Sequence, residues 1–131
     1  MKAHGKPFAP QFDAALDLWH SGDPEAAIAQ LEALAVQYPN EAAIHGMLAG
    51  YLWEEGRLLE ARPHAEAAAK LSPTSDLAAR FLFHVLYDLG DKRGALHELR
   101  RFRGSTASEE LREEWSNLIR QVEDELRTAR D

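Results

Sequence analysis

The sequence predicts an all-α fold built from helical hairpins stacked side by side. Gly22, Gly56 and Gly90 lie 34 residues apart, and each separates two stretches whose apolar residues recur at helical spacing. An alanine follows each glycine at the same distance, at Ala27, Ala61 and Ala95. A fixed period of this length is typical of repeated helical hairpins, each of which buries its apolar face against its neighbours.

The composition limits the class of protein and its partners. The chain has 131 residues, a formal net charge of −7 and no cysteine, which excludes disulfides and thiolate metal sites. The net negative charge disfavours nucleic acid and anionic membranes as partners. No signal sequence and no apolar run of the roughly 18 residues needed to span a membrane is visible. We therefore predict a cytoplasmic protein, and the excess of arginine over lysine favours a bacterial source.

The first repeat is predicted over about residues 8–39. Residues 1–7 lack helical periodicity and are predicted to be a flexible tail, so a single domain spans residues 8–131. Gly22 ends the first helix, and Asp23 is placed to cap the second helix of the pair.

The second and third repeats, about residues 40–73 and 74–106, follow the same scheme. Pro63 does not fit it, because a proline inside a helix costs about 3 kcal/mol. Either the helix that contains Pro63 begins late or it kinks at that residue.

A seventh helix, about residues 107–130, is predicted to cover the end of the stack. Thr106 and Glu109 have the spacing of a capping box at its start. The apolar residues beyond them form one narrow stripe, Leu111, Trp115, Leu118, Ile119, Val122 and Leu126. A stack of hairpins has an exposed apolar end that a polar-backed helix can cover. The alternative is that this stripe packs against a second copy of the chain.

The repeats resemble those of tetratricopeptide repeat proteins. Besides the glycine and alanine, the residue four positions before each glycine is apolar, at Leu18, Leu52 and Leu86. The resemblance covers about residues 8–107. It implies a right-handed α-solenoid of three helical hairpins with a seventh, C-terminal capping helix. It also implies a concave surface that holds segments of partner proteins. Phe83 departs from the pattern, which has a small residue at that position.

The resemblance implies that equivalent positions of the first helices form rows across the concave surface. Counting back three, six and ten positions from each glycine, the rows are Trp19, Trp53, Tyr87; Leu16, Gly50, His84; and Phe12, Gly46, Arg80. We predict that these nine residues form a partner-binding groove. Glycine inside a helix costs up to about 1 kcal/mol relative to alanine, so Gly46 and Gly50 are interpreted as a floor kept free of side chains.

Each part of this groove has an alternative interpretation. Trp19 and Trp53 are about equally compatible with packing between helices. The two glycines can instead allow two helices to approach closely. Arg80 can pair with Asp76, four residues before it on the same helix.

The sequence contains no recognisable catalytic or metal-binding motif. The six histidines lack metalloprotease spacing, and no glycine-rich phosphate loop is present. Arg80 and His84 resemble half of the carboxylate clamp of some tetratricopeptide domains, but the first repeat offers Phe12 and Leu16 in its place. We predict no enzyme activity, no cofactor, no metal and no strong selectivity for a free C-terminal carboxylate. The group formed by His84, Tyr87 and Arg80 is the one we would probe for acid–base chemistry.

The leading functional prediction is a protein–protein interaction module, an adaptor or chaperone-like protein that binds a peptide or helix of a partner. Apolar anchors would supply most of the recognition, with Arg80 and His84 pairing an acidic or polar group. We expect a monomer or a weak homodimer. The alternatives are a structural subunit that self-associates through the C-terminal helix, and a toxin-neutralising or secretion-chaperone partner.

Overall fold

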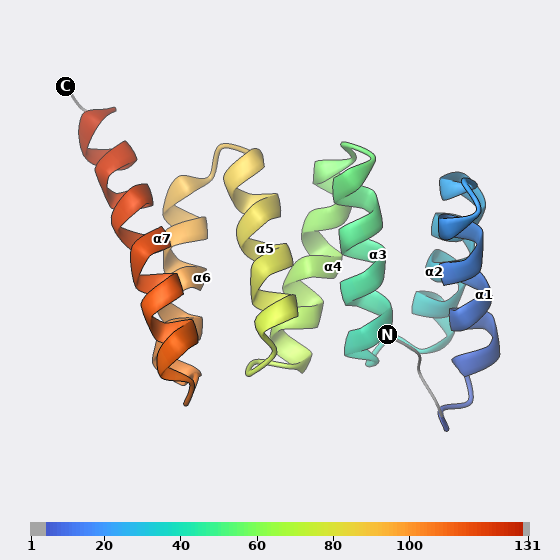
Figure 1. Cartoon of the computed structure of the whole chain (residues 1–131). Helices are drawn as coiled ribbons and strands as arrows, with labels where there is room; N and C mark the ends of the chain where they lie inside the picture. Colours follow the sequence, from blue (N-terminus) through green and yellow to red (C-terminus); the bar gives the residue numbers. More distant parts are fainter. Residues whose placement is uncertain (1–4, 130–131) are drawn as a thin grey trace.

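The computed structural model describes residues 5–129, and within this range it contains only α-helices, with no strand. Figure 1 shows the helices standing side by side in chain order, so the predicted all-α solenoid is confirmed. The helices are α1 (Ala9–His20), α2 (Pro24–Gln37), α3 (Ala42–Glu54), α4 (Leu58–Leu71), α5 (Asp76–Asp88), α6 (Lys92–Ser105) and α7 (Glu109–Thr128).

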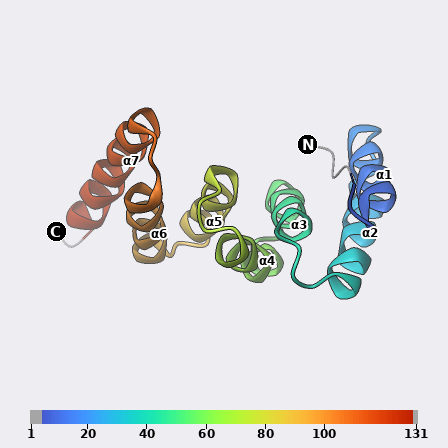
Figure 2. The same ribbon diagram turned by 90° about the horizontal axis from the view of Figure 1, so that it is seen from below.

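The helices form two curved layers. Seen along the helix axes, α1, α3, α5 and α7 lie on the inner side of an arc, and α2, α4 and α6 lie on the outer side (Figure 2). The pairs α1–α2, α3–α4 and α5–α6 pack as hairpins, and α7 packs against α6. The inner layer therefore places one helix of each repeat along a shared concave surface.

The three turn glycines have the backbone conformation that the repeat requires. Gly22, Gly56 and Gly90 have φ angles of 91°, 75° and 87°, a region that residues with a Cβ atom rarely adopt. The next residue donates its N–H to a carbonyl five positions earlier, as in Asp23 to Leu18 at 2.9 Å. This closes the first helix of each pair in a Schellman turn and reverses the chain.

The repeated alanines lie where the two helices of each hairpin meet. Ala27, Ala61 and Ala95 have no exposed surface. Because a methyl group occupies little space, each second helix can approach its partner closely. The predicted N-cap at Asp23 is confirmed, since its Oδ1 accepts a hydrogen bond from the Ala26 N–H at 3.2 Å.

The predicted capping box at the start of the seventh helix is wrong. Ser108 is the N-cap of α7, and its Oγ accepts a hydrogen bond from the Leu111 N–H at 3.2 Å. Thr106 lies two residues too early and accepts instead from the Ser108 N–H at 3.2 Å. Ser108 therefore takes the role assigned to Thr106, because it directly precedes the first helical residue.

The helix that contains Pro63 does not begin late. α4 begins at Leu58 and continues through Pro63. Proline cannot donate to the carbonyl of Leu59, four residues earlier. Leu59 is 78% exposed, so this part of the helix faces solvent, where the loss of one hydrogen bond is least costly.

The apolar stripe of α7 packs against its own stack. Trp115, Ile119 and Val122 are buried in the common core, and Leu118 and Leu126 pack against its edge. The face that was a candidate for self-association is thus largely used within the chain. The predicted tail lies partly outside the described residues, which begin at Gly5.

Candidate functional site

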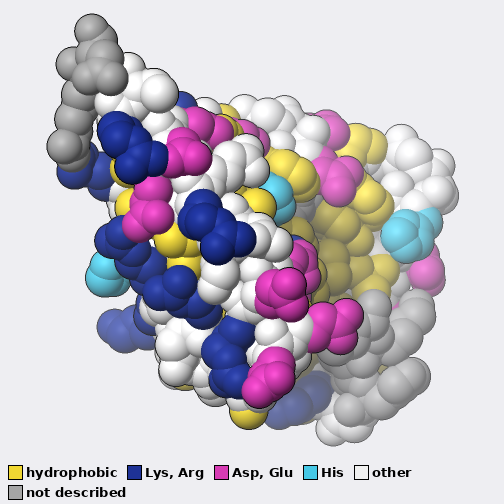
Figure 3. Space-filling model, turned by 60° about the vertical axis from the view of Figure 1, so that its left-hand side comes forward, with side chains coloured by type: hydrophobic (Ala, Val, Ile, Leu, Met, Phe, Trp, Pro, Cys, Tyr) yellow, Lys and Arg dark blue, Asp and Glu magenta, His cyan; other side chains and the backbone are white. Residues whose placement is uncertain are grey.

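The concave side of the arc carries a hollow lined by hydrophobic side chains, with acidic side chains along its edges (Figure 3). Four cavities open on this side, and their linings come mainly from the four inner helices. We call this surface the inner groove. Its two halves differ in chemistry.

The half formed by α1, α3 and the start of α5 is mostly apolar. It contains one cavity of about 180 Å³ beside Phe12 and Gly46, and a second of about 270 Å³ beside Leu16 and Trp19. Both cavities share two lining residues, Met47 and Phe81. Met47 of α3 and Phe81 of α5 therefore lie where the two cavities adjoin.

The two glycines of α3 have different surroundings. A Cβ atom at Gly46 would meet only Ala68, at an ordinary 3.8 Å, so Gly46 faces open cavity space. A Cβ atom at Gly50 would lie 2.8 Å from the ring of Phe81. Gly50 therefore provides room for a neighbouring side chain, which matches the close-approach alternative for that residue.

The aromatic row contacts the next inner helix at every repeat. Trp19 stacks on Tyr51 with ring centroids 3.9 Å apart. Trp53 donates its indole N–H to Asp88 Oδ2 at 2.6 Å, and the Tyr87 hydroxyl donates to Glu125 at 2.6–2.8 Å. The row joins successive repeats, as the packing alternative requires, and its members also line two of the cavities.

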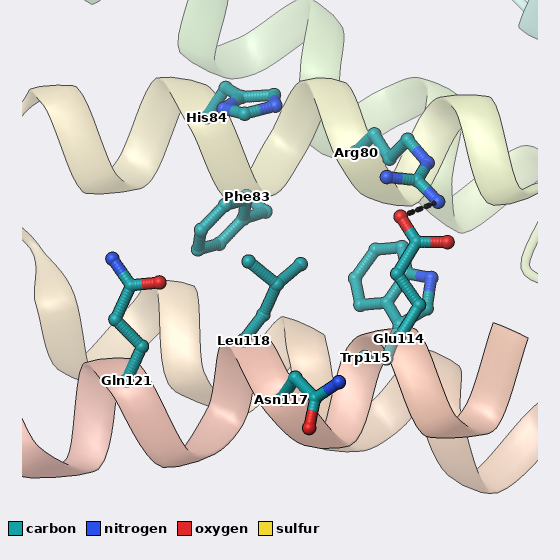
Figure 4. A pocket seen from close by; sticks show the side chains of 8 residues that line it. All are labelled: Arg80, Phe83, His84, Glu114, Trp115, Asn117, Leu118 and Gln121. Carbon is teal, nitrogen blue, oxygen red and sulfur yellow. Dashed lines mark ion pairs between the residues drawn. The ribbon is translucent and has the colours of Figure 1, made fainter.

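The half formed by α5 and α7 is a more polar trough. Two cavities of about 310 and 280 Å³ share Phe83, His84, Leu118 and Gln121. Figure 4 shows Phe83 and Leu118 facing each other across the trough from opposite helices. The phenyl group of Phe83, where the repeat pattern has a small residue, thus fills the interval between α5 and α7.

Arg80 is held by acidic side chains of its own chain. Its Nε lies 2.6 Å from Asp76 Oδ2, and its Nη2 lies 2.7 Å from Glu114 Oε1 (Figure 4 draws the second pair). Asp76 in turn accepts the indole N–H of Trp115 at 3.0 Å, and the guanidinium lies over the Trp115 ring, 5.3 Å from its centroid. Arg80 therefore fastens α7 to α5, and two carboxylates already neutralise it.

His84 stacks on an aromatic neighbour, and its surroundings favour the neutral ring. Its ring stacks on Trp53 with centroids 5.1 Å apart. Burial lowers the pKa of His84, and nearby Arg80 lowers it further, while Asp88 acts in the opposite direction. Among the described residues, His84, Tyr87 and Arg80 form no hydrogen bonds with one another, so the geometry does not assemble them into an acid–base chain.

The sequence did not single out several residues that line the groove. Met47, Phe81, Phe83, Leu118 and Gln121 all line it. Leu118 belongs to the apolar stripe predicted to cover the stack, because a helical period alone does not distinguish a core face from a groove edge. The position of these residues beside a cavity depends on how neighbouring helices are offset, which is a tertiary property.

A histidine pair lies between α3 and α4. His45 and His64 bring their Nδ1 atoms within 3.0 Å, and His45 Nε2 lies 2.7 Å from the carbonyl oxygen of Pro39. Within residues 5–129, no group of three or more metal-ligating side chains comes together. No helix in that range is both long enough and apolar enough to cross a membrane.

Comparison with known proteins agrees with this architecture. Residues 12–76 match the family description "Tetratricopeptide repeat". The matched residues are tetratricopeptide repeats, as the repeat pattern predicted. No curated protein sequence matches it significantly.

Two solved structures of one bacterial protein have the same fold. The type III secretion translocator chaperone SycD of Yersinia enterocolitica superposes with a TM-score of 0.80 at 16% identity, covering 92% of this chain and 86% of that one. SycD in complex with a peptide of the translocator YopD gives a TM-score of 0.77 at 17% identity, covering 88% and 92%. At such low identity the similarity establishes the fold and leaves the partner of this tetratricopeptide repeat protein open.

Proposed function

We propose that this protein binds an apolar segment of a partner protein in the inner groove. The observation that carries the proposal is the series of cavities along the concave side, two of them lined chiefly by apolar residues. Large apolar side chains of a partner would fill these cavities and lose contact with water, which contributes about 25 cal/mol for each Å² buried. A tetratricopeptide fold and a groove of this kind suit an adaptor or a chaperone.

A chaperone for an exported protein is the more specific form of this proposal. SycD has the same fold and has been solved with a peptide of a translocator. By analogy, this protein would keep an apolar segment of its partner covered until the partner is delivered.

A structural subunit that self-associates through α7 is less well supported. Trp115, the largest apolar residue of the α7 stripe, has no exposed surface, and Ile119 is 3% exposed. Self-association through that stripe would require α7 to leave its own stack.

The test uses a library of random 12-residue peptides displayed on phage and selected against the whole chain. Selected peptides are labelled, and their affinity is measured by fluorescence anisotropy for the wild-type protein and for Gly46→Leu. Leucine at position 46 fills the cavity beside Phe12, while its Cβ meets only an ordinary contact, so the fold should be retained.

The matched control is Ala29→Leu, which adds the same side chain at an exposed position of the outer helix α2. We expect Gly46→Leu to weaken binding at least tenfold and Ala29→Leu to leave it unchanged. Equal binding by all three proteins would contradict the proposed function.

A further inference from the structure

We propose that the partner segment is cationic, with lysine or arginine beside its large apolar side chains. The inference rests on the proposed function and adds the charge of the partner. It starts from two carboxylates, Glu54 and Asp88, that occupy equivalent positions in successive repeats, two residues before the turn glycine.

Each of these acids lies at the rim of a groove cavity. Glu54 lines the cavity of about 270 Å³ beside Trp19 and Leu16. Asp88 lines the cavity of about 280 Å³ beside Trp53 and Tyr87. A partner side chain that entered either cavity would pass a carboxylate.

In the part of the chain that the structure describes, the two carboxylates lack a cationic partner. Within residues 5–129 neither Glu54 nor Asp88 forms an ion pair with lysine, arginine or histidine. Asp88 accepts the Trp53 indole N–H through Oδ2. Its negative charge is therefore hydrogen-bonded but not neutralised.

Their position in the helices is also electrostatically unfavourable. Glu54 is the last residue of α3 and Asp88 the last of α5, and neither helix has a basic residue in its last turn. The C-terminal end of a helix carries partial negative charge and favours cations. A cation bound along this edge would meet the carboxylates and the partial negative charge of the helix ends together.

The cations near the groove do not compensate for these charges. Arg80 is paired with Asp76 and Glu114, and Lys92 lies 3.1 Å from Glu125. Burial lowers the pKa of His84. Among the described residues, Arg80 is the one lysine or arginine that lines a groove cavity, and it is already paired, while His20 lines the cavity beside Glu54. This reverses the sequence-based hypothesis that Arg80 and His84 pair an acidic group.

The shape of the two cavities suits a long basic side chain. Lysine and arginine pack their methylene stems against apolar surface while the charged head stays in water. Here the stem would contact Leu16 or Phe83, and the head would reach Glu54 or Asp88. Packed helices lie about 8–10 Å apart, a distance that two to four residues of extended chain would span at roughly 3.3 Å per residue. Because the side chains of an extended chain alternate between its two sides, basic residues two or four positions apart would face both carboxylates.

The experiment uses the peptides selected from the random library and a double variant, Glu54→Gln with Asp88→Asn. Asparagine keeps an oxygen that can accept the Trp53 indole N–H, so the contact between α3 and α5 is retained. The matched control, Glu32→Gln with Glu113→Gln, removes the same charge from two exposed positions on α2 and α7. Because both double variants have the same net charge, general attraction to an acidic protein affects them equally.

We expect the selected peptides to be enriched in lysine and arginine next to large apolar residues. At 50 mM NaCl the groove variant should bind them about three- to tenfold more weakly than the wild type, and the control within twofold. At 500 mM NaCl the difference should shrink, because salt screens exposed charges.

The outcomes separate the two proposals. If peptides bind the wild type and lose affinity with Gly46→Leu, but show no basic excess or bind the groove variant normally, the cationic partner is wrong and the groove stands. If no selected peptide depends on Gly46, the proposed function fails, and the cationic partner fails with it.

Discussion

Gly46 and Gly50 show how two identical residues on one helical face can have different roles. Both lie on α3, four residues apart, and both give up the helix stability that alanine would supply. Gly46 faces a cavity, whereas Gly50 lies under the Phe81 ring. The first glycine thus keeps groove volume open, and the second accommodates the neighbouring helix.

This difference predicts opposite responses to alanine. Gly46→Ala should stabilise the protein by about 0.5–1 kcal/mol, because the new methyl group meets no obstacle. Gly50→Ala should be at least about 1 kcal/mol less stable than Gly46→Ala, because Phe81 must leave its packed position. Urea unfolding followed by circular dichroism measures both. Equal stabilisation by the two substitutions would mean that Phe81 does not need Gly50.

The His45–His64 pair has one consistent arrangement of protons when both rings are neutral. The Pro39 carbonyl can only accept, so His45 Nε2 carries the proton and His45 Nδ1 accepts from His64 Nδ1–H. Burial lowers the pKa of His64, and the neighbouring His45 lowers it further. The folded protein therefore favours neutral His64.

The protein should lose stability on acidification through the range where unfolded histidine takes up a proton. An unfolded histidine has a pKa of about 6.5. Because the pKa values of His64 and His84 are lowered in the folded state, the unfolded chain binds more protons below that pH, and the free energy of unfolding falls. Urea midpoints at pH 7.5, 6.5 and 5.5 measure this.

A matched pair of variants assigns the His64 part of that effect. His64→Asn keeps a donor toward His45 but cannot titrate, so it should reduce the loss of stability between pH 7.5 and 5.5. His97→Asn, at an exposed position of α6, should leave the loss unchanged. Identical pH profiles for His64→Asn and the wild type would contradict the assignment.

At the scale of elements, Trp115 is the largest side chain with which α7 packs against the stack. Trp115 is fully buried, packs against Phe102 with ring centroids 4.8 Å apart, and donates its indole N–H to Asp76. Arg80 adds a second connection by pairing with both Asp76 and Glu114. The side chain that closes the core thus also joins α7 to α5 and α6.

Trp115→Ala should cost about 3–5 kcal/mol, because it leaves a large cavity. In a solenoid each unit contacts only its neighbours, so α7 should lose amide hydrogen-exchange protection more than α1 and α2 do. Trp115→Phe keeps most of the apolar contact and loses the bond to Asp76, so its cost should be smaller. Uniform loss of protection along the chain would show that α7 is not a separable element.

At the scale of the whole molecule, the sequence predicted the architecture well because the signals are local. A turn glycine with positive φ, such as Gly56, and the buried alanine five residues later specify each hairpin within a short stretch of chain. Repetition then places equivalent residues on one face. Hence the sequence predicts that α1, α3 and α5 share one layer, whereas it predicts α7 only as a helix that covers the end of the stack.

The site was predicted less well because its contacts join residues far apart in the sequence. The pairing of Arg80 with Asp76 follows from helical spacing, but its pairing with Glu114 depends on where α7 docks. The covering of Gly50 by Phe81 depends on the offset of α5 against α3. The N-cap of α7 was predicted at Thr106, but it is Ser108, two residues later. Residue spacing alone did not locate the first helical residue.

The indole N–H signals in the NMR spectrum test most directly whether a partner segment binds in the inner groove. The chain has three tryptophans: Trp19 and Trp53 line the inner groove, and Trp115 also borders one groove cavity but has no exposed surface. Titration with a selected peptide should shift the Trp19 and Trp53 indole signals, together with amides of α3 and α5, while α2 and α4 change little. Shifts confined to the outer helices, with both groove indoles unmoved, would contradict binding in the inner groove.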